Sequence, residues 1–186
     1  MGSILNRKKQ NGVTLMETLI IITIFIILTT VTTAIIITAY GVVSQQQIYL
    51  NLQQEGATAM REITQAANLG LNVTDYDIYS SGPSQLVLKV NAIDTNNNPV
   101  ADKYDYFVFY LDGTTLKMLT DVDPASVGRT DETKVIANFV KKIIFRYNKV
   151  DPTHAKIVYI TLILSKTYKG LEKEIISQSS AYLRNN

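Results

Sequence analysis

The longest apolar stretch of the sequence, TLIIITIFIILTTVTTAIIITAYGVV, runs from Thr18 to Val43 and contains 26 residues without a charge. A helix needs roughly 20 apolar residues to cross the hydrocarbon core of a bilayer. A run of about 10–14 is typical of a buried helix, and the apolar part of a secretory signal has about 7–15 residues. The stretch therefore predicts a helix that spans a membrane and is retained on the protein.

Charged residues on either side of this stretch predict its orientation. Three cations, Arg7, Lys8 and Lys9, precede it, and none follows it closely. By the positive-inside rule, residues 1–12 stay in the cytoplasm. We therefore expect a single-pass protein of the cytoplasmic (inner) membrane, with the chain after about residue 44 outside the cytoplasm.

One acidic residue, Glu17, is the only charge between Lys9 and Glu55. An acidic side chain at mid-bilayer costs about 2.5–3.5 kcal/mol and usually needs a partner. No basic residue lies in the same span, so a partner has to come from another chain or from a new amino terminus made by cleavage just upstream. A plain signal anchor would explain the apolar run but not Glu17.

The composition excludes several classes of chemistry. The 186 residues include no cysteine and one histidine, His154, which excludes disulfides, cysteine-based zinc sites and thiol nucleophiles. Without residues 1–12 the chain has 15 basic and 16 acidic residues, so its net charge gives no reason to expect a nucleic-acid partner. No P-loop, nucleophile elbow or zincin motif is present, and we do not expect an enzyme.

The stretch RKKQNGVTLMETL, residues 7–19, resembles the processing site of type IV prepilins and pseudopilins. In that family a short basic leader ends in glycine, which is Gly12 here. The resemblance implies that a prepilin peptidase cuts between Gly12 and Val13 and methylates the new amino terminus at Val13. Glu17 occupies the position of the family's glutamate, four residues beyond that terminus. Val13 is a departure, because the family more often has phenylalanine there.

The same resemblance implies a structural role in a filament. The α-amine of Val13 would be largely cationic at neutral pH, since its ordinary pKa is about 7.7–8.0. It would pair in lipid with Glu17 of its own or a neighbouring subunit, which selects how subunits dock. The implied partners are the prepilin peptidase, other pilin or pseudopilin subunits, an inner-membrane assembly platform and membrane lipid.

Several functions fit this amino terminus. The leading hypothesis is a minor subunit of a type IV pilus-like filament or of a type II secretion pseudopilus. A DNA-uptake (competence) pilus is an alternative machine. A signal-anchored extracytoplasmic binding or enzyme domain, with the helix as a simple tether, is the alternative from a different class.

The helix is expected to continue beyond the membrane. No proline precedes Pro83, and between residues 45 and 69 apolar or small residues recur at three- and four-residue spacing. A helix from Val13 to about Asn68 would be roughly 84 Å long at 1.5 Å per residue. Gly41 and Gly56 are helix weak points and therefore candidate bends.

After Gly70 the pattern changes to the two-residue period of strands. We expect strands over residues 85–92, 104–111, 116–120, 139–147, 156–165 and 173–183, a turn over residues 96–99 and a surface loop over residues 121–134. The fold class is therefore α+β, with a long amino-terminal helix packed on an antiparallel sheet. This layout resembles the pilin fold. The expected parts are a leader (1–12), a membrane-spanning assembly helix (13–43), its amphipathic continuation (44–69) and a β-rich extracytoplasmic domain (70–186). The closing strands resemble, loosely, those of J-type minor pseudopilins and W-type minor pilins.

Three groups in this domain are weaker candidates for chemistry. No cofactor is expected, although Ca²⁺ could bind Asp75/Asp77, Asp121/Asp123 or Asp94 with 96–98; such residues usually bind turn backbone instead. His154 is expected in a solvated turn. The basic residues at 141, 142, 146 and 149 alternate with aromatic residues as in single-strand binders, but outward-facing strand residues explain them better.

Overall fold

The computed structural model describes residues 14–184 and has an α+β fold with a pilin-like layout. One long helix, α1 (Leu15–Leu69), is followed by eight strands, and a short 3-10 helix, η1 (Pro152–His154), lies between the sixth and seventh. All strands pair antiparallel. The fold class predicted from the sequence is confirmed.

The first part of α1 belongs to a compact unit of its own, which ends at Gln45. Every residue from Leu15 to Tyr40 is exposed there, although the stretch consists largely of isoleucine, leucine, valine and threonine. An apolar helix that nothing covers is stable only where its surroundings are also apolar. In length and composition α1 can cross a membrane, and no membrane is included in the structure.

The second part of α1 belongs to the other unit, which begins at Gln46 and includes both sheets. Its buried residues follow the predicted spacing of three and four and form one stripe. They are Leu52, Gly56, Ala59, Met60, Ile63, Ala66 and Ala67. This stripe confirms the predicted amphipathic continuation, and α1 is unbroken at both Gly41 and Gly56.

Five strands form the first sheet, in chain order β1-β2-β3-β4-β5. Their bounds are Asn72–Val73 for β1, Leu86–Ile93 for β2, Pro99–Asp112 for β3, Thr115–Asp121 for β4 and Glu132–Ala137 for β5. A tight turn after Asp112 joins β3 to β4, and Gly113 there has the positive φ (60°) that such a turn requires. The predicted strands 85–92, 104–111 and 116–120 are confirmed, and β3 starts earlier, at Pro99.

Three strands form a second sheet, in the order β6-β7-β8. Their bounds are Val140–Tyr147 for β6, Ile157–Tyr168 for β7 and Leu171–Tyr182 for β8. The predicted strands are confirmed, but a single sheet had been expected. The chain passes between the sheets through Asn138 and Phe139, and the positive φ of Phe139 (57°) marks the change of direction.

The predicted surface loop over residues 121–134 is only partly correct. The loop runs from Val122 to Asp131, and β5 begins at Glu132. The sequence did not predict this strand because its residues are largely polar. They are polar because β5 lies at the edge of its sheet, where Glu132 and Lys134 are exposed. The loop is also less superficial than expected, because Ser126 is buried.

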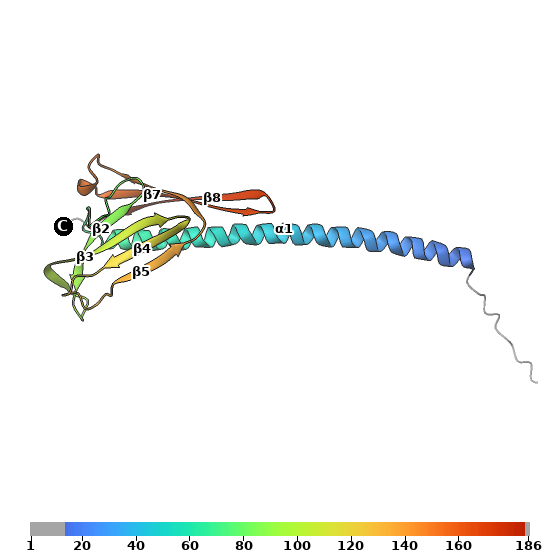
Figure 1. The fold of residues 1–186 in the computed structure, drawn as a ribbon, viewed down its shortest axis with the longest axis horizontal. Helices are drawn as coiled ribbons and strands as arrows, with labels where there is room; N and C mark the ends of the chain where they lie inside the picture. Colours follow the sequence, from blue (N-terminus) through green and yellow to red (C-terminus); the bar gives the residue numbers. More distant parts are fainter. Residues whose placement is uncertain (1–13, 185–186) are drawn as a thin grey trace, which may run out of the picture. The chain divides into compact units, whose positions relative to one another are not determined.

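Both sheets and the second part of α1 contribute to one hydrophobic core. Figure 1 shows β2, β3, β4 and β5 along one side of this part of the helix, and β7 and β8 along another. Ile63 of α1, Phe109 of β3 and Phe145 of β6 are almost completely buried in this core. Since the helix supplies one apolar stripe to two sheets, the domain cannot complete its core without the second part of α1.

Candidate assembly site on the amino-terminal helix

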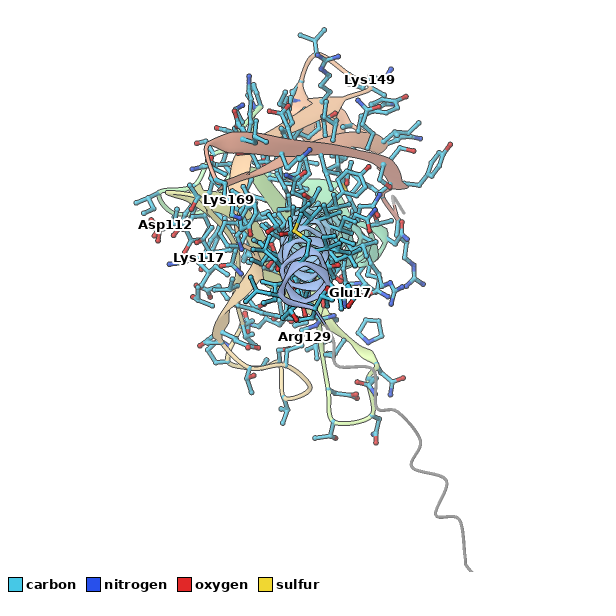
Figure 2. All side chains as sticks on the ribbon, turned by 90° about the vertical axis from the view of Figure 1, so that its right-hand side faces the viewer. Glu17, Asp112, Lys117, Arg129, Lys149 and Lys169 are labelled. Carbon is cyan, nitrogen blue, oxygen red and sulfur yellow. The ribbon has the colours of Figure 1, made fainter. Side chains whose placement is uncertain are left out.

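Glu17, which is labelled in Figure 2, forms a reciprocal capping box with Thr14 at the start of α1. The backbone N–H of Thr14 donates to Glu17 Oε2 at 2.8 Å, and the backbone N–H of Glu17 donates to Thr14 Oγ1 at 3.3 Å. The Thr14 hydroxyl also donates to Glu17 Oε2, at 3.0 Å. Such a box satisfies N–H groups that the first helical turn leaves without partners. Glu17 therefore has a local structural role that had not been predicted.

The threonine hydroxyls of the apolar stretch, and the hydroxyl of Ser44 just after it, form hydrogen bonds within the helix. Threonine and serine hydroxyls donate to the backbone carbonyl four residues earlier, at 2.8–3.3 Å. They belong to Thr18, Thr23, Thr29, Thr30, Thr32, Thr33, Thr38 and Ser44. These hydroxyls need no outside partner in an apolar medium. The carboxylate of Glu17 is thus the one charged group of residues 14–54.

The hydrogen bonds of Glu17 leave part of the carboxylate available. Both contacts from Thr14 reach Oε2, and within residues 14–184 no hydrogen bond to Oε1 is found. The remaining predicted site residues, Gly12 and Val13 with the basic residues at 7, 8 and 9, lie outside the described part of the chain.

Comparison of the sequence with models of known protein families, and with curated proteins, gives no match.

His154 lies in η1, in a solvated turn as predicted. Its Nδ1 is 2.9 Å from Asp151 Oδ2 and 3.1 Å from the Thr153 hydroxyl. Hydrogen bonds from Thr153 have the largest effect in lowering the pKa of Asp151, and the contact with His154 lowers it further. The imidazole side chain is 78% exposed, and these contacts close a local turn.

The acidic residues considered for Ca²⁺ bind backbone in turns. Asp94 Oδ1 accepts from the N–H groups of Asn96 and Asn98, both at 2.8 Å, and these bonds lower the pKa of Asp94. Asp75 accepts from the N–H of Ser81 at 2.7 Å, and Asp123 from that of Ala125 at 2.8 Å. Within residues 14–184 no group of three or more histidine, cysteine, aspartate or glutamate residues has a metal-binding arrangement. The turn interpretation therefore explains these three aspartates.

The basic stretch lies on β6 and the connection that follows it. Lys142 and Arg146 are exposed, whereas Ile143 and Phe145 face the core. Lys141 Nζ binds Glu172 at 2.9 Å and Glu174 at 2.8 Å, both on β8, so its charge is compensated. The outward-facing strand interpretation is confirmed for these residues of β6.

A polar cleft of about 730 Å³ had no signal in the sequence. It combines residues of β1, β2 and β3 with the η1 region, namely Leu71, Asn72, Lys89, Asn91, Tyr104, Thr153, His154 and Lys156. Lys89 Nζ lies 3.5 Å from the centre of the Tyr104 ring. Since these residues come from separate segments, only the folded chain brings them together.

Proposed function

We propose that this chain is a structural subunit, made in small amounts, of a type IV pilus-like filament or of a type II secretion pseudopilus. The precursor is stored in the cytoplasmic membrane, and a prepilin peptidase cuts it between Gly12 and Val13. The mature subunit then joins related subunits through α1 on an inner-membrane assembly platform. The observation that carries the proposal is the single carboxylate, Glu17, in the first turn of an uncovered apolar helix just after a basic leader.

The energetic argument concerns the carboxylate of Glu17. A charge of this kind costs about 2.5–3.5 kcal/mol in the middle of a bilayer, and removing the partner of a buried pair is costly as well. Cleavage before Val13 would create an amine one residue ahead of the Thr14 N–H that Glu17 already binds. The carboxylate can therefore meet an amine of its own chain or of a neighbouring subunit, and pairing offsets the expense of both charges.

The division of α1 supports the same proposal. Its first part has no buried residue between Leu15 and Tyr40, whereas its second part is embedded in the domain core. A simple tether needs only to cross the membrane once. A filament subunit needs an exposed apolar surface on which other subunits can pack.

Mass spectrometry of the mature amino terminus tests the proposal. The chain is expressed with a prepilin peptidase, and we expect a polypeptide that begins at a methylated Val13. A Gly12→Leu variant, in which the side chain obstructs the cleavage site, should keep Met1. If the unmodified chain also keeps Met1 in the presence of active peptidase, the filament proposal is wrong and the tether alternative remains.

A further inference from the structure

In the hairpin of β7 and β8, two lysines lie directly opposite each other. Lys169 and Gly170 form its turn, both with positive φ (48° and 78°), as a tight two-residue hairpin turn requires. The register pairs Tyr168 with Leu171 and then Lys166 with Lys173. Like charges that lie directly opposite each other across two strands are destabilising. The two lysine charges at the end of this hairpin therefore repel each other, and an anion bound from outside the chain would relieve the repulsion.

The carboxylates near the tip do not neutralise these lysines. Lys166 and Lys173 share a face with buried Leu164 and Ile175, because side chains alternate along a strand. Glu172 and Glu174 lie on the other face, and both bind Lys141. Within residues 14–184 neither Lys166, Lys169 nor Lys173 forms an ion pair. Residues 166–173, which form the tip, contain three lysines and one glutamate and have a net charge of +2.

Apolar and aromatic groups accompany the lysines. Leu171 is 55% exposed beside Tyr168. Lys169 Nζ lies 5.5 Å from the centre of the Tyr168 ring, and Lys166 Nζ lies 4.1 Å from that of Phe139. Aromatic rings together with lysines that extend along apolar surface are typical of groups at a membrane–water boundary.

Within the domain, the hairpin points toward the amino-terminal end of the domain's own part of α1, which begins at Gln46. Along β7 and β8, Ser179 contacts Thr64, Leu164 lies against Gly56, and Lys166 lines a cleft that also includes Ile48. The contacts thus move toward the start of the domain's part of α1, and the turn extends roughly 10 Å beyond Lys166 at 3.3 Å per residue. The apolar run ends at Val43, three residues before this unit begins.

We propose that the tip of this hairpin, Lys166 to Lys173, docks on anionic lipid headgroups of the membrane that the apolar run spans. A lipid phosphate between Lys166 and Lys173 removes their repulsion, and Tyr168 and Leu171 lie at the boundary of the acyl chains. This inference rests on the membrane-anchored state of the proposed function, but not on cleavage or on filament assembly. The contact would hold the domain against the bilayer while the subunit is stored.

Fluorescence in proteoliposomes tests the docking, with the full chain as the sample. The chain has no cysteine, so Thr167→Cys places a single environment-sensitive fluorophore near the tip. Val150→Cys, in the connection between β6 and β7, is the matched control at a fully exposed position. Headgroup spin-labelled lipids act as quenchers in vesicles of phosphatidylcholine with or without phosphatidylglycerol.

We expect quenching at position 167 in vesicles with phosphatidylglycerol, weaker quenching in phosphatidylcholine alone, and little at position 150 in either. Replacing Lys166 and Lys173 by glutamine should lower the ratio of docked to undocked domain roughly fivefold per lysine. High salt should reduce docking as well. Inorganic phosphate added to the protein in detergent should not change the emission, since the source of the anion is the lipid surface.

Two results would overturn the inference. One is equal quenching at positions 167 and 150, and the other is quenching at position 167 that depends neither on phosphatidylglycerol nor on the two lysines. Neither result affects the filament proposal. If carbonate washing releases the chain from the vesicles, the apolar run does not anchor it, and both the storage step of the proposed function and the docking are refuted.

Discussion

Arg129 Nη1 lies 2.5 Å from Asp105 Oδ2, and this ion pair connects the loop of residues 122–131 to strand β3. The Asp105 side chain is completely buried, and it also accepts from the Ser126 hydroxyl at 2.9 Å and from the N–H of Asp123 at 3.0 Å. Arg129 donates further to the carbonyl of Asn91 at 2.7 Å. A second ion pair, between Asp123 of the loop and Lys103 of β3, measures 3.6 Å. A chain without cysteine thus closes this loop with hydrogen bonds and two ion pairs.

Replacing Arg129 by methionine should destabilise the domain by about 3 kcal/mol, because it leaves a buried carboxylate without its cation. Denaturant unfolding of the detergent-solubilised protein measures the effect. Lys117→Met is the matched control, since Lys117 forms an exposed ion pair with Asp112 (Figure 2). That variant should change the free energy of unfolding by about 1 kcal/mol or less. Equal effects of the two variants would contradict the structural role of Arg129.

Gly56→Ala should destabilise the domain although alanine favours helix. A Cβ at Gly56 would lie 2.8 Å from Ser177 Oγ and 3.2 Å from Leu164 Cδ1. The contact with Ser177 should outweigh the roughly 1 kcal/mol that alanine gains over glycine in a helix. Adding Ser177→Ala should recover most of the loss, and this coupling between the two variants is the quantity to measure. Gly41→Ala is the control, because a Cβ there has nothing within 4 Å. Additive effects at positions 56 and 177 would show that the helix does not approach β8 this closely.

Two substitutions at Glu17 separate helix capping from charge. Glutamine retains an acceptor for the Thr14 N–H and can still complete a capping box, whereas alanine loses both the acceptor and the charge. If the ion pair drives assembly, both Glu17→Gln and Glu17→Ala should be processed by the peptidase and both should fail to enter filaments. Thr14→Val, which removes the capping hydroxyl but keeps Glu17, should assemble. Filaments containing the glutamine variant at normal levels would assign Glu17 to capping alone.

Acid should weaken the contact between β6 and β8. The hydrogen bond from Lys141 lowers the pKa of Glu172 below its ordinary value of 4.5. A carboxyl group with a lowered folded-state pKa adds stability above its unfolded-state pKa and loses that contribution as the pH falls through the folded-state pKa. When the pH drops from about 5 to about 3, the melting temperature of the Lys141→Gln variant should therefore fall less than that of the unmodified protein.

The control for this pH experiment is Lys173→Gln, which removes a neighbouring lysine that has no ion pair within residues 14–184. Its melting temperature should fall with acid as that of the unmodified protein does. If Lys141→Gln follows the same curve as well, the pair of Lys141 and Glu172 does not contribute to the acid sensitivity.

The helix, its exposed and buried parts, and most strands could be predicted from the sequence, because each depends on a short-range pattern. The uncharged run to Val43, the stripe that includes Leu52 and Ile63, and the alternation in β2 and β7 can all be recognised within a few residues. The lone charge at Glu17 is equally local. The T-x-x-E pattern of its capping box with Thr14 is local as well, and the folded helix shows that the two side chains bind each other's backbone N–H.

The contacts between distant segments could not be predicted from the sequence, because they depend on the packing of the whole fold. Arg129 and Asp105 are 24 residues apart in the sequence. The loop that includes Arg129 has the sequence of an ordinary polar connection, and only the folded structure shows that its partner Asp105 is buried. The division into two sheets, the approach of Gly56 to Ser177 and the opposition of Lys166 and Lys173 depend in the same way on strand order and register. The local sequence pattern determines which face of a strand or helix a side chain lies on. The residue that it contacts across that face depends on the packing of the whole core.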